Sequence, residues 1–308
     1  MNSKNYAAID IGSCAARLLI KKVDISDTGD VAYTKLFFIR YPLRLGDDVF
    51  TIGKVSKERL KKIVTMIKAF KHLMKLYDVD EYKACATSAM RDAKNSKDVI
   101  EKVLKSTGIK IEIIDGKEEA SIIYNNHVEM VKSMADTCAY VDVGGGSTEV
   151  TVIKDGEKIK SCSYNIGTIR MLHLPEEESR QILSRMQEEL SEISEELGPV
   201  EMVGSGGNIN KMYKILSKKK TGGKRITVTG VTELFGKMNA MSAEQRMETY
   251  DMKPDRAEVI IPAAKIFLAV AEALKSTYIY TPVLGLSDGI IDNMCSVAHS
   301  VVEKPSDD

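Results

Sequence analysis

The 308-residue sequence has no excess of charge, no long apolar run and no sign of an export signal. Lys and Arg together number 44, and so do Asp and Glu, so the overall charge gives no argument for binding to nucleic acid or to a membrane surface. No apolar stretch reaches the length of a membrane-spanning helix, and the N-terminus lacks a signal-peptide pattern. We therefore expect a cytoplasmic protein that binds neither a nucleic acid polymer nor a membrane.

Cysteines and histidines are also too scattered to indicate a disulfide framework or a metal site. The five cysteines are odd in number and form no C-x-x-C pair, which predicts reduced thiols. The four histidines show no metal-ligand spacing. We expect these histidines to be surface or partly buried residues.

Strand and helix patterns, by contrast, alternate through both halves of the chain. The first half predicts strands at 6–11, 17–23, 31–39, 82–87 and 109–114, and helices at 56–77, 97–107 and 117–132. The second half predicts strands at 137–143 and 149–153, a strand, glycine loop and helix over 200–216, and helices at 175–197, 231–240, 242–249, 255–275 and 287–301. This alternation is typical of an α/β protein.

One block of sequence occurs twice. AAIDIGSCAARLLI (7–20) aligns with AYVDVGGGSTEVTVI (139–153), so that Asp10 matches Asp142 and Gly12 matches Gly144. Each block is an apolar strand that ends in Asp-x-Gly, followed by a turn of small residues and a second apolar strand. The repeat predicts two similar domains with a cleft between them. We expect the domains to span 1–128 and 129–308, with the last helix, at about 287–303, packing on the first domain.

Both turns have the composition of phosphate-binding loops. Consecutive small residues let several backbone N–H groups point at one anion, and glycine lets the backbone come close to it. Asp10 and Asp142 end their strands beside the turns, and carboxylates next to bound phosphate commonly hold Mg²⁺. The alternative is that both segments are ordinary hairpins, which is a stronger alternative for GSCA than for the D-x-G-G-G-S-T-E block at 142–149.

Further motifs resemble those of the exopolyphosphatase and guanosine pentaphosphate phosphatase family. They are AAIDIGSCAARL (7–18), ATSAMRDAKN (86–95), GKEEASIIY (116–124) and the DVGGGSTE block, followed in family order by NIGTIRM, VGSGGNI, PDRAEVIIPA and GLSDGII. The resemblance covers nearly the whole chain. It implies a fold of two similar actin-like, ribonuclease H-like domains, with mixed sheets flanked by helices.

The resemblance also implies an activity and its residues. Family members use Mg²⁺ to remove the terminal phosphate of polyphosphate or the 5′ γ-phosphate of guanosine pentaphosphate, and many form homodimers. Glu119 matches the catalytic glutamate, which orients or deprotonates the attacking water, and Glu149 is the second catalytic carboxylate. Asp142, Glu149 and Asp10 are the implied metal ligands. The implied phosphate-binding residues are Gly12, Ser13, Cys14, Arg91, Gly144, Gly145, Gly146 and Ser147. For Arg17 we consider a structural role instead of phosphate binding, in which its side chain pairs with a carboxylate under the loop.

The chain departs from the family at phosphate-facing positions. Cys14-Ala15 replaces the usual Asn-Ser, and GLSDG (285–289) replaces G-L-R-E-G. The Cys14-Ala15 change suggests one alternative to a hydrolase, a polyphosphate or nucleotide sensor that binds without turnover. A kinase of the same fold is a second alternative.

Overall fold

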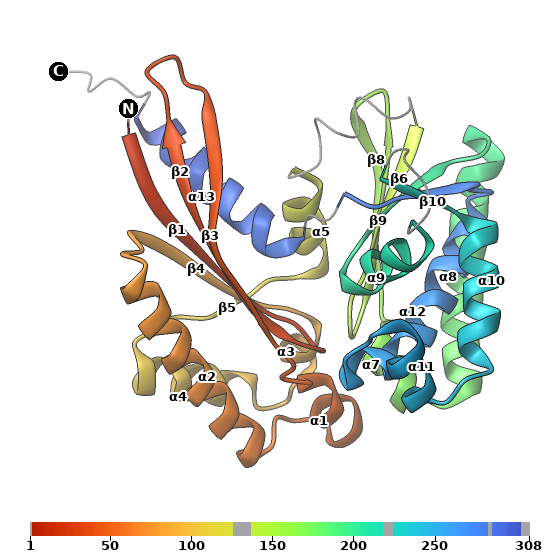
Figure 1. Ribbon diagram of the computed structural model, residues 1–308, viewed down its shortest axis with the longest axis horizontal. Coiled ribbons are helices and arrows are strands. Elements are labelled where there is room, and N and C mark those ends of the chain that lie inside the picture. Colours follow the sequence, from red (N-terminus) through yellow and green to blue (C-terminus); the bar gives the residue numbers. More distant parts are fainter. Residues whose placement is uncertain (1, 126–136, 218–223, 283–284, 303–308) are drawn as a thin grey trace. The chain divides into compact units, whose positions relative to one another are not determined.

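The structure is a computed structural model that describes residues 2–125, 137–217, 224–282 and 285–302. Its contacts divide the chain into two units (Figure 1). One consists of Met1–Asn126 with Gly285–Asp308, and the other of His127–Leu284. The expected domain border near residue 128 lies outside the described residues. No helix in the described part of the chain is both long and apolar enough to cross a membrane.

The first unit contains a five-stranded mixed sheet in the order β3-β2-β1-β4-β5. β1 (Asn2–Ile11), β2 (Ala16–Ile25) and β3 (Val31–Tyr41) form an antiparallel meander. β4 (Glu81–Ala86) then pairs parallel with β1, and the short β5 (Glu112–Ile113) pairs parallel with β4. The parallel pairs require crossover connections, which the helices of the unit supply.

Helices cover both faces of this sheet (Figure 1). Ile9 and Ile11 of β1 belong to the core that α2 and α4 close, whereas Tyr6 and Ala8 are buried on the opposite face. α13 packs against β1 and β2 and also against α5. The helices are α1 (Leu45–Ile52), α2 (Lys57–Leu76), α3 (Ser88–Asp92), α4 (Ser96–Thr107), α5 (Gly116–Asn125) and α13 (Leu286–Val302).

The second unit is built around a six-stranded sheet in the order β10-β11-β9-β6-β7-β8. The strands are β6 (Thr137–Val143), β7 (Thr148–Lys154), β8 (Glu157–Tyr164), β9 (Glu201–Ser205), β10 (Arg225–Thr227) and β11 (Tyr278–Tyr280). The helices are α7 (Thr168–His173), α8 (Glu176–Leu197), α9 (Gly207–Leu216), α10 (Val228–Asn239), α11 (Ala243–Tyr250) and α12 (Pro254–Ala273). α12 is the central helix of this unit, and most of its side chains are buried.

The two sheets repeat one another, which confirms the predicted fold class. The order β3-β2-β1-β4-β5 corresponds to β8-β7-β6-β9-β11, with the same antiparallel and parallel pairings. The two hairpin loops close with the same bond, from Gly12 N to Ala15 O (3.1 Å) and from Gly144 N to Ser147 O (3.0 Å). Gly12 and Gly144, which align in the sequence, therefore occupy the same position in their respective hairpin loops.

The structure differs from the prediction in two respects. The strand predicted over 109–114 is reduced to the two residues of β5, although Ile109, Ile111 and Ile114 are buried. Six short elements were not predicted: α1, α3, β8, α7, β10 and β11. The predicted end of the helix at residue 132 lies outside the described residues, and α5 is described as far as Asn125.

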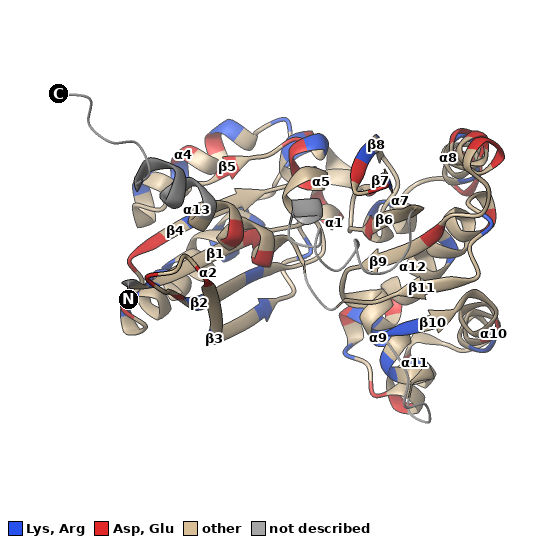
Figure 2. Ribbon diagram, turned by 90° about the horizontal axis from the view of Figure 1, so that it is seen from above, with Lys and Arg blue, Asp and Glu red and all other residues tan. Residues whose placement is uncertain are grey.

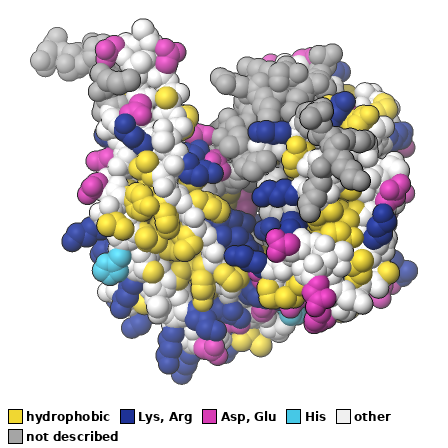
Figure 3. All heavy atoms as spheres, viewed as in Figure 1, with side chains coloured by type: hydrophobic (Ala, Val, Ile, Leu, Met, Phe, Trp, Pro, Cys, Tyr) yellow, Lys and Arg dark blue, Asp and Glu magenta, His cyan; other side chains and the backbone are white. Residues whose placement is uncertain are grey.

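β3 is an edge strand with several exposed apolar side chains. Val31, Tyr33, Phe38, Ile39 and Tyr41 are each more than a third exposed. Figure 3 shows hydrophobic side chains gathered on this face of the first unit, with Lys and Arg side chains around them. Basic side chains on an edge strand are a common protection against unwanted strand pairing.

Candidate functional site

The GGGS loop of the second unit is held by the segment that opens α7. Gly144 O accepts a hydrogen bond from Thr168 N (2.9 Å), and Gly145 O accepts from Ile169 N (2.8 Å). Gly146 O accepts from Nε of Arg170 at 2.6 Å. Three consecutive carbonyl groups of the loop therefore point toward the start of α7.

The direction of these carbonyl groups fixes the direction of the amides. The described residues contain no cis peptide bond, and in a trans peptide the C=O of one residue and the N–H of the next point in opposite directions. The N–H groups of Gly145, Gly146 and Ser147 consequently point away from α7. Three adjacent amides directed to one side form a nest that suits an anion.

Gly167 allows this close contact between the loop and the start of α7. A Cβ atom at Gly167 would lie 2.6 Å from Ser147 N and from the carbonyl carbon of Gly145. Real Cβ atoms essentially never come so close to backbone, so only glycine fits here. Thr148, directly after the loop, is fully buried and donates its hydroxyl to Ile166 O at 2.6 Å. The loop is therefore fixed at both ends.

Asp142 and Glu149 lie directly opposite each other where β6 and β7 meet this loop. Their carboxylate oxygens come within 4.8 Å, and Glu149 is 2% exposed. Ser163 of β8 stands opposite Glu149 in turn and donates a 2.9 Å hydrogen bond to Oε1. Two carboxylates at this spacing offer the hard oxygen ligands that a divalent cation prefers.

The first unit carries the corresponding loop at 12–15. Gly46 N donates to Ser13 O, and Arg44 N donates to Cys14 O, each at 2.9 Å. By the same trans-peptide geometry, the N–H groups of Cys14 and Ala15 point away from the start of α1. Ser13 is buried, and its hydroxyl oxygen accepts a hydrogen bond from Ala89 N at 3.2 Å.

Asp10 differs from its counterpart Asp142 in the residue that lies opposite it on the paired strand. Its partner across the hairpin is Arg17, and Arg17 Nη1 forms an ion pair with Asp10 Oδ2. On the other side Asp10 neighbours Cys85, whose thiol pKa is raised to about 12 by burial, so Cys85 stays uncharged. One oxygen of Asp10 is thus engaged by a cation of the protein itself, as in the alternative considered for Arg17.

Glu119 lies in the first turn of α5 and is 7% exposed. Arg91, at the end of α3, reaches Glu119 Oε2 with Nη1 at 2.9 Å. The same nitrogen donates to Ile114 O at 2.9 Å, just before α5 begins. Asp115 caps the helix by accepting from Glu118 N at 2.8 Å, and this backbone hydrogen bond lowers the Asp115 pKa. Arg91 therefore anchors both the catalytic candidate and the start of its helix.

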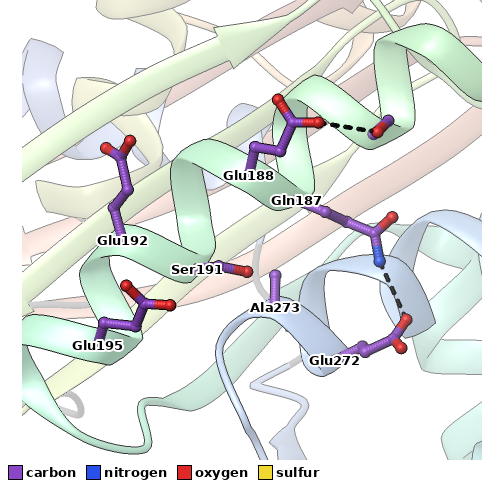
Figure 4. A pocket seen from close by; sticks show the side chains of 8 residues that line it. Gln187, Glu188, Ser191, Glu192, Glu195, Glu272 and Ala273 are labelled. Carbon is purple, nitrogen blue, oxygen red and sulfur yellow. Dashed lines mark hydrogen bonds between the residues drawn. The ribbon is translucent and has the colours of Figure 1, made fainter.

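A separate hollow of about 480 Å³ lies on the second unit between α8 and α12. Figure 4 shows carboxylates along its walls, two of them hydrogen-bonded to neighbouring side chains, and Figure 2 shows acidic residues along α8. Its negative charge makes it unsuitable for a polyanion such as a phosphate chain. It is lined by Ser184, Gln187, Glu188, Ser191, Glu192, Glu195, Glu272 and Ala273.

Within each unit, the structure brings the predicted residues together in distinct groups. The first unit joins Arg91 with Glu119 and, separately, Asp10 with Arg17. The second unit joins the GGGS loop with Asp142 and Glu149. Sequence reasoning missed Ser163, Gly167 and Arg170, which hold these groups in place. The NIGTIRM motif at 165–171 contains two of them and was the available signal.

Comparison with known proteins identifies the family to which this fold belongs. The duplicated sheets are those of the actin-like fold, and the structure superimposes on the Aquifex aeolicus member of the Ppx/GppA family with a TM-score of 0.75 and 26% identity, covering 99% of this chain and 100% of that one. The model of the Ppx/GppA phosphatase family matches residues 24–297, and the chain belongs to this family. It is a phosphohydrolase.

Two curated relatives have named activities. One is exopolyphosphatase 1 of Mycobacterium tuberculosis, 27% identical over 299 residues, which cover 92% of this chain and 86% of the relative. The other is the guanosine-5′-triphosphate,3′-diphosphate pyrophosphatase of Aeromonas salmonicida, 24% identical over 97% of this chain and 61% of that protein.

Proposed function

We propose that the protein releases the terminal phosphate of inorganic polyphosphate, or the 5′ γ-phosphate of guanosine pentaphosphate, by Mg²⁺-assisted attack of water. The names of the two relatives support these substrates. The observation that carries the proposal is the pair Asp142 and Glu149 beside a loop with three amides directed to one side. This arrangement combines anion binding with cation binding, which hydrolysis of a phosphoanhydride requires.

In this proposal, Asp142 and Glu149 hold Mg²⁺, and Asp10 assists. The two carboxylates provide oxygen ligands, and Ser163 orients one of them through its hydrogen bond. Bound there, Mg²⁺ would neutralise charge that develops on the phosphate oxygens. Asp10 has the smaller part because Arg17 already engages one of its oxygens.

The two glycine loops bind phosphate oxygens through their backbone amides. In the second unit the donors are the N–H groups of Gly145, Gly146 and Ser147, and in the first those of Cys14 and Ala15. The N–H groups of Gly144 and Gly12 are used to close their own loops, so these two glycines shape the loops and do not donate to the phosphate. Backbone donors held by hydrogen bonds on their carbonyl side need no rearrangement when the substrate arrives. Such positioning is the main requirement for phosphoryl transfer, which involves little covalent chemistry by the protein.

Glu119 orients or deprotonates the attacking water. Its carboxylate is buried and held by Arg91 at 2.9 Å, so it has a defined direction. A positioned general base of this kind contributes a factor of about 10²–10⁴ to the rate. Arg91 fixes Glu119 through Nη1, and its positive charge also favours an anionic substrate nearby.

The Cys14-Ala15 departure is compatible with this activity. The first loop keeps the same closing bond as the second, since Gly12 N still donates to Ala15 O. Arg40 of β3 places Nη2 at 3.5 Å from Cys14 Sγ, which adds a positive charge beside the loop. A hydrolase therefore accounts for the loop without recourse to a binding-only sensor.

The experiment is phosphate release by the purified protein in Mg²⁺ and, in parallel, in excess EDTA. Polyphosphates of several lengths, guanosine pentaphosphate and ATP are compared at equal concentration of terminal phosphate. We expect release from one or both of the first two classes and none in EDTA. Tight binding of these substrates without release in Mg²⁺ would instead show a sensor.

A further inference from the structure

The first turn of α13 touches the helix that carries Glu119. Gly289 lies against Ile122 of α5, and a Cβ atom at Gly289 would lie 2.8 Å from Ile122 Cγ2 and closer still to the Ile122 carbonyl oxygen. The contact is partly with backbone, which cannot rotate away as a side chain can. Any residue other than glycine at this position must therefore displace α5 or α13.

Ile122 is three residues after Glu119, on adjacent positions of one helix face. Because α5 is a short helix, a displacement of Ile122 moves the whole helix, including its first turn with Glu119. Both residues are buried, Ile122 at 4% and Glu119 at 7% exposure, and the packed surroundings cannot absorb the shift locally.

An ion pair with little solvent exposure holds the residue before Gly289 in the same turn of α13. Lys21 of β2 places Nζ 2.8 Å from Asp288 Oδ1, with side-chain exposures of 10% and 17%. Asp288 also accepts a hydrogen bond from Gly285 N through Oδ2 at 3.2 Å, which caps the start of the helix. The turn is thereby tied to the strand that follows the first glycine loop.

We infer that Gly289 and the Lys21–Asp288 ion pair are positioning residues, which set the place of the Glu119 carboxylate by fixing α13 against α5. The inference rests on the proposed role of Glu119 and adds how that role is supported. Losing such alignment by about 1 Å can cost about 10²-fold in rate. This inference gives a function to the GLSDG segment, which differs from the family pattern. Asp288 pairs with Lys21, and Gly289 contacts Ile122 of α5.

The test compares Gly289→Ala with Gly285→Ala, four residues earlier, where an added Cβ would meet nothing within 4 Å. For each protein, kcat and KM for phosphate release are measured together with hydrogen exchange of the α5 amides. We expect Gly289→Ala to lower kcat about 10–100-fold, with KM changed less than twofold, and to speed exchange across 116–122. Gly285→Ala should match the wild type in all three.

A second variant keeps the inference testable if Gly289→Ala does not fold. Asp288→Asn keeps the capping oxygen but removes the charge that pairs with Lys21. We expect it to lower kcat about 3–10-fold with KM unchanged, as for a modest loss of alignment. Lys21→Arg, which retains the charge, should keep more of the wild-type kcat than Lys21→Met.

The outcomes separate this inference from the proposed function. Wild-type kcat and wild-type α5 exchange in a folded Gly289→Ala or Asp288→Asn protein would overturn the positioning role. Full turnover in Glu119→Gln, or no phosphate release by the wild type, would overturn the proposed role of Glu119. In that case the exchange measurement still decides whether α13 fixes α5.

Discussion

Asp142 and Glu149 face each other directly across the β6–β7 hairpin, with carboxylate oxygens within 4.8 Å. The equivalent positions of the first unit hold Asp10 and Arg17, which form an ion pair. The same hairpin therefore carries opposite charges in one unit and like charges in the other. Like charges directly opposite on paired strands destabilise the sheet, and a bound cation would remove that repulsion.

Neutralising one of these carboxylates should stabilise the protein while it abolishes activity. In Mg²⁺-free buffer, Asp142→Asn is expected to raise the free energy of unfolding by about 0.2–1 kcal/mol, because it removes the repulsion with Glu149. Added Mg²⁺ should raise the melting temperature of the wild type but not of the variant. Thermal melts with and without Mg²⁺ measure both effects.

The matched control for that experiment is Asp155→Asn, in the turn after β7. Asp155 is exposed and has φ 53°, a conformation that asparagine adopts readily. It should melt like the wild type and respond to Mg²⁺ in the same way. A lower melting temperature for Asp142→Asn than for the wild type without Mg²⁺ would contradict the repulsion.

Ser163→Ala should weaken metal activation because it removes the hydroxyl donor to Glu149. Loss of a group that orients a metal ligand typically costs about 10–100-fold in metal affinity or activity. The control is Ser161→Ala, two residues earlier on the same strand, where the hydroxyl pairs with Thr151 at 3.1 Å instead. The Mg²⁺ concentration for half-maximal phosphate release should rise in Ser163→Ala alone, and an equal rise in both variants would count against the role of Ser163.

Gly167→Ala should disable the GGGS loop without unfolding the protein. The added Cβ would lie 2.6 Å from the loop backbone, so the loop must shift and lose the alignment of its amides. We expect KM for the phosphate substrate to rise at least about 10-fold, because one hydrogen bond to a charged group contributes about 1.5–3 kcal/mol. Gly236→Ala in α10, where a Cβ meets nothing within 4 Å, is the control. An unchanged KM in Gly167→Ala would show that the loop does not bind substrate.

Much of the fold could be predicted because the pattern of the sequence and the packing agree. The helix predicted over 56–77 is α2, Lys57–Leu76, and Ser56 caps it by accepting a hydrogen bond from Arg59 N at 3.1 Å. β8 was missed because its residues are mostly exposed or half-buried and show no apolar alternation. Such a strand is specified by its neighbour β7 rather than by its own residues.

Site residues could be predicted where neighbouring residues of one segment form the site. They could not be predicted where the site joins segments that are distant in the sequence. The Asp-x-Gly hairpins are local, so Asp10 and Asp142 could be placed from the sequence. The contact between Arg91 and Glu119 joins residues 28 apart, and only the family resemblance singled out Glu119. Lys21 and Asp288 lie at opposite ends of the chain, and no local pattern predicts their pairing.

Stability should also depend on pH through Asp292 of α13. Burial, together with the nearby Asp288, raises the Asp292 pKa above its ordinary value, although Lys21 opposes the shift. The folded state then binds this proton more tightly than the unfolded state, so stability falls as pH rises from about 4 through the raised pKa. Asp292→Asn should therefore be more stable than the wild type at pH 7, and the difference should vanish at pH 3. Denaturant unfolding at both pH values measures it, and a variant less stable at pH 7 would contradict the sign.

Single-turnover phosphate release by Glu119→Gln in Mg²⁺ tests the central claim most directly. Substrate binding is measured on the same samples, so loss of affinity and loss of chemistry are separated. We predict wild-type affinity with release slowed about 10²–10⁴-fold, as expected when a positioned base is removed. Release at the wild-type rate from a fully bound variant would show that Glu119 does not act on the attacking water.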